Sequence, residues 1–263
     1  MPVATPAGRF EGRVVTVTGA GNGIGRGVAI AFTREGATVY GIDLDSAGLE
    51  TTAEHIGTGR GRFIGLNADV SKPEAISRSI EEILRESGRA DVLVNNAGIN
   101  MAKRIADLEI SDWDKVFDTN LKSTYLFCKG FWPTFRAQKA GVILNVSSVM
   151  GQVGGIGSPA YCSTKAAIIM LSRCLAKDGA QYGIRVNTVC PGYIDTPIME
   201  RALQVLPDPE RARRELIGRM PLGRMGSPAD IAAGMLFLAS AEAAYISGTE
   251  LTIDGAVTAT QID

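Results

Sequence analysis

The sequence predicts one α/β domain built on a doubly wound, parallel, seven-stranded sheet with helices on both faces. Short runs rich in β-branched residues alternate with longer amphipathic segments, which is typical of parallel strands joined by right-handed helical crossovers. The chain has 263 residues and 45% hydrophobic content, enough to bury a single large core. The expected strands are Val14–Val17, Thr38–Ile42, Phe63–Leu66, Val92–Val94, Val142–Val146, Val186–Val189 and Leu251–Ile253.

Three of the helices between these strands have a recognisable first turn. Ser71, Ser111 and Ser227 each stand three residues before a carboxylate, which is the spacing of a capping box. We therefore expect each of these serines to be an N-cap.

The two least regular segments are the N-terminus and the region before Ser227. Residues 1–9 are aperiodic and expected to be flexible, so residues 10–263 form the domain. Prolines interrupt the long segment Pro191–Ser227, which we expect to be irregular, with a solvated helix face at Glu210–Glu215. Long loops of this kind are usually functional. We interpret residues 193–226 as a substrate lid.

Composition excludes several functional classes. A net charge of -1 and a pI near 6.0 do not favour nucleic acid or an anionic membrane as a partner. Without a leader or a bilayer-length apolar run, the protein is expected to be cytoplasmic. Cys128, Cys162, Cys174 and Cys190 lack metal-ligand spacing and are expected to be buried and reduced. The only histidine, His55, is expected on a surface helix, so neither a Ser-His triad nor a metal site is predicted.

The most informative pair is Tyr161 and Lys165, which stand four residues apart in a predicted helix, thirteen residues after Ser148. Helical residues at i and i+4 share one face, so the ammonium should lie beside the phenol. A neighbouring cation favours the ionised phenol, and we expect it to lower the pKa of Tyr161. A phenol tuned in this way can serve as a general acid and base.

A second motif predicts a dinucleotide site. Thr18–Gly25 is glycine-rich, follows the first strand and opens a helix, so its backbone N-H groups can approach a pyrophosphate. Asp43 ends the second strand, where a carboxylate can bind ribose hydroxyls and repel a 2'-phosphate. Neither Asn22 nor Leu44 supplies a basic partner for that phosphate. The pattern favours NAD over NADP.

From about Gly12 to Gly255 the chain resembles the short-chain dehydrogenase/reductase family, whose fold is of the Rossmann type. The motifs that carry the resemblance are Thr18-Gly-x-x-x-Gly-Ile-Gly25, Asn95-Asn-Ala-Gly98, Asn120, Ser148, Tyr161-x-x-x-Lys165 and Pro191-Gly-x-x-x-Thr196. One departure is Ala256, where the family commonly has a second glycine.

The resemblance implies a metal-free oxidoreductase acting on CH-OH groups. Tyr161 would pass a proton to or from the substrate oxygen, and Ser148 would stabilise that oxygen. Lys165 would lower the pKa of the tyrosine and bind the nicotinamide ribose, and Asn120 would hold a water in a proton relay. The implied NAD-binding residues are Gly19, Asn22, Gly23, Ile24, Gly25, Asp43, Asp69, Val70, Asn96, Ala97, Gly98, Tyr161, Lys165, Pro191, Gly192, Ile194 and Thr196.

The residues expected at the substrate mouth are mostly apolar and include no obligatory cation or carboxylate. They are Asn100, Met101, Val149–Val153, Tyr193, Ile198, Met199 and Leu203. We therefore expect a neutral, partly apolar secondary alcohol or ketone. The resemblance and the apolar segments Ser111–Ala137 and Ser158–Tyr182 together indicate a homotetramer. Two alternatives stay open: an NADPH-dependent 3-ketoacyl-type reductase, and a non-catalytic dinucleotide-binding sensor or scaffold.

Overall fold

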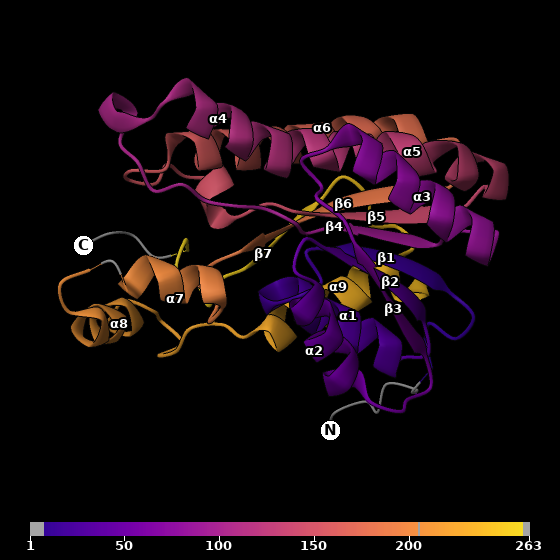
Figure 1. Ribbon diagram of the computed structural model, residues 1–263, viewed down its shortest axis with the longest axis horizontal. Coiled ribbons are helices and arrows are strands. Elements are labelled where there is room, and N and C mark those ends of the chain that lie inside the picture. The colour runs from indigo at the N-terminus through magenta and orange to yellow at the C-terminus, as the bar shows by residue number, and fades with distance from the viewer. Residues whose placement is uncertain (1–7, 205, 260–263) are drawn as a thin grey trace.

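A computed structural model describes residues 8–204 and 206–259. Within these residues, seven strands form one sheet in the order β3-β2-β1-β4-β5-β6-β7, with every neighbouring pair parallel (Figure 1). All the predicted strands are confirmed to within two residues. Their bounds are Val14–Thr18 (β1), Thr38–Asp43 (β2), Arg62–Asn67 (β3), Val92–Asn95 (β4), Gly141–Val146 (β5), Ile184–Pro191 (β6) and Glu250–Ile253 (β7).

Helices cover both faces of the sheet, so its central strands are apolar throughout. One face carries α1 (Gly23–Arg34), α2 (Ser46–Ile56) and α9 (Pro228–Ala239). The other carries α3 (Pro73–Ser87), α4 (Ile110–Phe117), α5 (Ser123–Gln138) and α6 (Pro159–Ala180). Every residue of β1 and β4 is buried, as expected for strands packed on both faces. The doubly wound, single-domain fold is confirmed.

Short helical turns complete the second layer and the two loops beside it. Asp118–Lys122 is a π-helical turn between α4 and α5. The 3-10 turns are Ile105–Asp107, Val149–Gly151 and Ala241–Ala243.

Only one of the three predicted N-caps is confirmed. Ser227 caps α9 in a full capping box with Asp230. α3 begins instead at Pro73, whose fixed φ suits the first helical position, while the N-H of Ser71 is bonded to Asp69 in the preceding turn. α4 begins at Ile110, so Ser111 lies inside the helix.

The region predicted to be irregular contains two helices, α7 (Pro197–Gln204) and α8 (Pro209–Gly218). Each starts at a proline, because proline at the first helical position loses no hydrogen bond. The exposed, charged face of Glu210–Glu215 on α8 is confirmed. A parallel bridge between Ile194 and Gly226 closes the base of this segment, leaving both helices outside the sheet layers (Figure 1).

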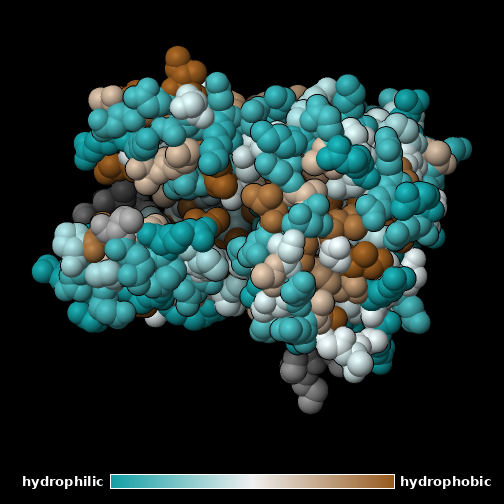
Figure 2. Space-filling view, in the orientation of Figure 1, coloured by the Kyte–Doolittle hydropathy of each residue, from teal (hydrophilic) through white to brown (hydrophobic). Residues whose placement is uncertain are grey.

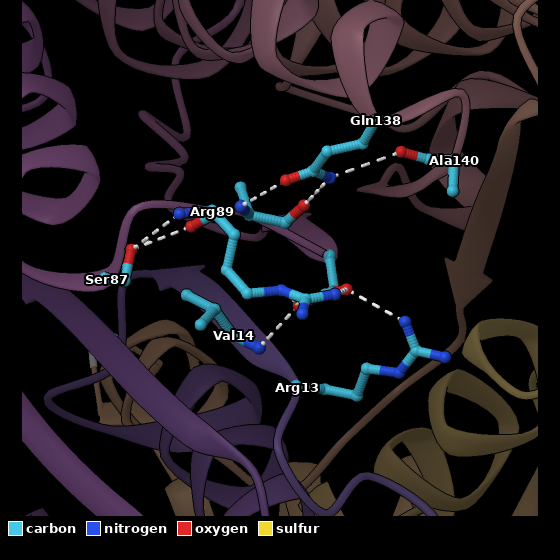
Figure 3. Close-up of polar contacts among 8 residues, drawn as sticks. Arg13, Val14, Ser87, Arg89, Gln138 and Ala140 are labelled. Atoms are coloured by element: carbon cyan, nitrogen blue, oxygen red, sulfur yellow. Dashed lines mark hydrogen bonds and ion pairs between the residues drawn. The ribbon is translucent and has the colours of Figure 1, made fainter.

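Asp91 organises the amino edge of the sheet (Figure 3). Its carboxylate accepts hydrogen bonds from Arg89 at 2.6 and 2.9 Å, from Arg13 at 2.9 Å and from the N-H of Val14 at 2.9 Å. Burial alone would raise the pKa of Asp91, but these bonds hold it below its usual value. Gln138 of α5 bonds the backbone beside this carboxylate.

The cysteine prediction is only partly confirmed. All four thiols are free, but Cys174 is exposed on the outer face of α6 and Cys162 is half-buried; Cys128 and Cys190 are buried. His55 is exposed on α2, as predicted.

The N-terminal prediction falls mainly on residues 1–7, which lie outside the described part of the chain. The backbone N-H groups of Gly8 and Arg9 both donate to the carboxylate of Glu35. None of the described helices is long and apolar enough to cross a membrane.

Candidate active site

A cavity of about 990 Å³ lies at the carboxyl edge of the sheet, between the glycine loop, the strand ends and α7 and α8 of the predicted lid. Apolar side chains gather at the hollow between the lid and the layer that carries α4 (Figure 2). In open parallel sheets this edge is where ligands bind. Except for Gly25, every residue predicted to contact the cofactor lines the cavity, as do the predicted catalytic residues Ser148, Tyr161 and Lys165.

The predicted catalytic side chains Ser148, Tyr161 and Lys165 come from two neighbouring elements. Tyr161 and Lys165 lie one turn apart near the start of α6, with the lysine Nζ 5.5 Å from the centroid of the phenol ring. Ser148 is the second residue after β5, and its Oγ accepts a hydrogen bond from the N-H of Met150 at 3.1 Å. Lys165 is buried and donates to the carbonyl oxygen of Val146 at 2.8 Å. The predicted juxtaposition of phenol and ammonium is confirmed.

The expected direction of the tyrosine pKa shift is wrong for this structure. Burial raises the pKa of Tyr161, and hydrogen bonding to Ser148 only partly opposes that rise. The same burial lowers the pKa of Lys165 from 10.5 to about 8. Desolvation disfavours the charged form of both groups, and sequence spacing gives no measure of burial. Burial thus favours the neutral phenol of Tyr161, the form that donates a proton.

Asn120 lies behind the cavity wall rather than in it. It is fully buried in the π-helical turn, where its side chain accepts from the N-H of Ile99 at 2.8 Å and donates to the Ile99 carbonyl at 2.9 Å. It also donates to Thr164 at 3.2 Å, and the Thr164 hydroxyl donates to the carbonyl of Tyr161 at 2.8 Å. Asn120 thus joins the loop after β4 to the first turn of α6.

The glycine loop has the shape of a phosphate cradle. Gly19 has a φ of +71°, and a Cβ added there would lie 2.8 Å from Nδ2 of Asn96. A Cβ on Gly25 would lie 1.9 Å from the carbonyl oxygen of Gly19, so Gly25 is a packing position behind the cavity wall. Asn22, the N-cap of α1, makes no side-chain capping bond. First-turn N-H groups are left available for an anion, and the residues fit a dinucleotide.

Asp43 stands at the rim of the same cavity. Its carboxylate accepts from the N-H of Gly21 at 2.8 Å and from the N-H of Asp45 at 3.0 Å. Asp45 also lines the cavity, and its carboxylate accepts from the N-H of Gly48 at 3.0 Å as the N-cap of α2.

Two residues that support the loop were not assigned this role from the sequence. The guanidinium of Arg26 bonds the carbonyl of Gly21 and, through Nε, the hydroxyl of Thr52 at 3.1 Å. Asn96 donates from its side chain to the carbonyl of Thr18 at 2.9 Å while also lining the cavity. Its position in the first turn of α1, directly after the glycine motif, could have suggested that Arg26 contacts the loop.

Asp69 and Val70 line the cavity beside the end of β3. Burial would raise the pKa of Asp69, but bonds from Ser71 and the charges of Lys72 and Lys115 lower it. Lys115, on α4, also lines the cavity and was not predicted.

The substrate end agrees only in part with the prediction. The predicted residues that line it are Asn100, Val149, Met150, Tyr193, Ile198, Met199 and Leu203. Those that do not are Met101, Gly151, Gln152 and Val153, because the 3-10 turn folds away after Met150. Thr119, Arg201, Ala202 and Leu216 were missed. The predicted set included no cation, but the cavity is also lined by Arg201 of α7.

Comparison with known proteins is consistent with this geometry. Residues 19–258 match the protein family described as enoyl-(acyl carrier protein) reductase. The chain is 40% identical over 249 residues to dehydrogenase/reductase SDR family member 6 of Rattus norvegicus, covering 94% of this chain and 98% of that one. It is 39% identical over 253 residues to cyclopentanol dehydrogenase of Comamonas testosteroni, covering 96% and 99%. The crystal structure of levodione reductase superposes with a TM-score of 0.91 at 32% identity, covering 96% and 100%.

Proposed function

The chain belongs to the short-chain dehydrogenase/reductase family of oxidoreductases, and we propose that it interconverts a secondary alcohol and a ketone with NAD(H) as the cofactor. The observation that carries the proposal is the meeting of Ser148, Tyr161 and Lys165 at one end of a cavity whose other end is acidic.

The bound nicotinamide would supply the hydride acceptor or donor. The chain's own residues act on the substrate oxygen: Tyr161, as the tyrosinate, takes the hydroxyl proton during oxidation and, as the neutral phenol, returns it during reduction. Ser148 hydrogen-bonds the same oxygen and stabilises its developing charge. Lys165, one turn from the phenol, favours its ionised form when the lysine is protonated. Asn120 holds the first turn of α6 in place and, as a proposal, a relay water behind the lysine.

The choice of NAD rests on charge at the adenosine end. The carboxylates of Asp43 and Asp45 both line the rim, and each Asp43 oxygen has a lone pair left for a ribose hydroxyl. A 2'-phosphate placed there would meet two negative charges. The guanidinium of Arg26 lies behind the loop and does not line the cavity.

The preferred substrate is neutral and partly apolar. Val149, Met150, Ile198 and Leu203 surround the catalytic end and would favour a hydrocarbon body. Arg201 supports a second candidate, a ketone that carries a carboxylate. Turnover of neutral ketones and of carboxylate-bearing ketones distinguishes the two candidates.

Two further alternatives keep specific support. The chain is 38% identical over 247 residues to the 3-oxoacyl-[acyl-carrier-protein] reductase FabG of Thermotoga maritima, which favours the NADPH-dependent 3-ketoacyl-type reductase. The sensor reading has less support, because Ser148, Tyr161 and Lys165 are all present and lie in the cavity wall.

The test is fluorescence titration of NADH and NADPH, followed by turnover of neutral and acidic secondary alcohols and ketones. We expect tighter NADH binding and turnover of at least one neutral panel member. Asp43→Ala should narrow the NADH/NADPH preference, whereas exposed Glu54→Ala on α2 should leave it unchanged. Tighter NADPH binding would favour the ketoacyl alternative. Tight binding with no turnover of any panel member would favour the sensor.

We also propose that the protein is a cytoplasmic homotetramer. A second hollow on the outer face of α4, α5 and α6 is lined by apolar residues, including Phe117, Leu121, Tyr125 and Leu171. Apolar exposed surface of this kind favours self-association. Light scattering at micromolar concentration should give about four times 27.8 kDa; a particle of monomer mass would contradict the proposal.

A further inference from the structure

The buried hydroxyl of Ser147 is not used by the chemistry described above. Ser147 precedes the catalytic Ser148, and only 2% of its surface is exposed. Its N-H donates to the carbonyl of Val189 on β6 at 2.8 Å, which fixes its backbone to the sheet. Its Oγ donates to the backbone carbonyl of Lys165 at 2.8 Å, although the two residues lie eighteen positions apart.

Lys165 is consequently held at both ends by consecutive residues of one strand end. The ammonium donates to the carbonyl of Val146 at 2.8 Å, while the main chain of the lysine accepts from Ser147. The next residue, Ser148, carries the catalytic hydroxyl. The position of Tyr161 and Lys165 relative to the Ser148 hydroxyl therefore depends on the hydrogen bond from Ser147 to the carbonyl of Lys165.

The hydrogen bond between Ser147 and the carbonyl of Lys165 is tightly packed. A Cβ added to Gly151 would lie 2.7 Å from Oγ of Ser147 and 2.8 Å from the carbonyl carbon of Lys165. The 3-10 turn after Ser148 therefore lies directly against both groups and covers their hydrogen bond.

We propose that Ser147 is a positioning residue: through the carbonyl of Lys165 it sets the first turns of α6, and so the relation of Tyr161 to Ser148. The proposal rests on the proposed function, because it assigns a role within the same site. Helices are rigid over one turn, so a displacement of Lys165 also displaces Tyr161. Misplacement of reacting groups by even 1 Å can cost about 100-fold in rate.

The chain offers a matched control in Ser172. This serine is also buried on α6 and also joins the helix to β5, since its hydroxyl accepts from the side chain of Asn145 at 2.8 Å. It lies about two turns beyond Lys165 and outside the cavity wall. Ser172→Ala removes a comparable hydrogen bond between α6 and β5 but keeps the bond from Ser147 to Lys165.

The experiment compares Ser147→Ala, Ser147→Cys and Ser172→Ala in the full-length protein. Both alanine variants should lower the midpoint of thermal unfolding by about 2–8 °C. Ser147→Ala should also lower kcat by about tenfold, with Ser147→Cys, a weaker donor of similar shape, between it and wild type. Ser172→Ala should keep kcat within about twofold of wild type.

A second readout needs no turnover and separates this proposal from the identity of the substrate. The ultraviolet tyrosinate signal of each protein, minus that of its Tyr161→Phe counterpart, titrates Tyr161 alone. We expect Ser147→Ala to move that titration to higher pH and Ser172→Ala to leave it in place. If Ser147→Ala matches Ser172→Ala in both titration and kcat, Ser147 is only structural and the proposal is overturned. Should Ser147→Ala fail to fold, a wild-type titration in Ser147→Cys would overturn it equally.

Discussion

The two edges of the sheet bury charge in opposite ways. At the amino edge, Asp91 receives four hydrogen bonds from two arginines and a backbone N-H (Figure 3). At the carboxyl edge, Lys165 is also buried, but within the described part of the chain its ammonium bonds only the carbonyl of Val146 and meets no carboxylate. The pKa of Asp91 is held low, in its charged form, whereas that of Lys165 falls to about 8, toward its neutral form.

This difference separates stability from reactivity. A buried charge with a full set of partners, such as Asp91, joins two chain segments, and removing it leaves those partners unpaired. A buried charge with few partners costs folding free energy but has a pKa close to working pH, where it can influence proton transfer. At the amino edge, Asp91 stabilises the fold. At the carboxyl edge, buried Lys165 lowers the stability of the fold but has a pKa suited to proton transfer.

The strongest test of this contrast removes the proposed acid at the carboxyl edge. Tyr161→Phe should lower kcat by about 10²–10⁴-fold, because only the transferable proton is lost. NADH affinity should stay within a few-fold and the unfolding midpoint should not fall, since the phenol makes no stabilising ion pair. Tyr245→Phe, at a fully exposed ring, is the control. Parallel losses of cofactor binding and rate would show that the role of Tyr161 is misassigned.

At the amino edge, Asp91→Ala should destabilise the protein by about 3–5 kcal/mol, measured by urea unfolding. In the folded fraction, kcat should change little. The folded pKa of Asp91 lies below its unfolded value near 3.8, so its contribution is complete above that pH and is lost as pH falls through the folded pKa. The variant and wild type should therefore converge in acid. Asp114→Ala, at an exposed position on α4, should change stability by less than about 0.5 kcal/mol.

Replacing the carboxyl-edge charge should have the opposite effect on stability. The lowered pKa of Lys165 implies that its charged form costs roughly 3 kcal/mol at neutral pH, partly offset by its bond to Val146. Lys165→Met should therefore raise stability by about 1–3 kcal/mol while abolishing turnover. Because the folded pKa is depressed, wild-type stability should rise between pH 8 and 10.5, and the advantage of the variant should shrink there. Exposed Lys177→Met on α6 should show neither effect; lower stability of Lys165→Met would contradict the contrast.

The smallest expected effect concerns backbone strain. Turns that lead into strands at the amino edge use glycine at positive φ, as at Gly36 and Gly183. The turn after β7 at the carboxyl edge instead has Ala256 at φ +71°. Ala256→Gly should stabilise the protein by about 0.5–1 kcal/mol, the strain of alanine less the extra entropy lost by glycine. Ala244→Gly, at φ -57°, should destabilise by a similar amount and serves as the control.

Local patterns were sufficient wherever structure depends on near neighbours. The strands were predictable because β-branched runs of this length pack well in a sheet buried on both faces. Tyr161 and Lys165 were predictable as neighbours because four residues make about one helical turn. Ser71 was misassigned as a cap because Pro73 decides where α3 begins, and Ser111 because α4 already begins one residue earlier, at Ile110.

The sequence alone therefore determined the positions of the strands along the chain, the glycine loop and the pairing of phenol with ammonium, since each depends on residues close along the chain. Only the tertiary structure decided the direction of the Tyr161 pKa shift, the seat of Lys165 on Ser147, the entry of Arg201 into the cavity and the bonds around Asp91. Those features depend on burial and on contacts between segments far apart in sequence, and local spacing carries no measure of either.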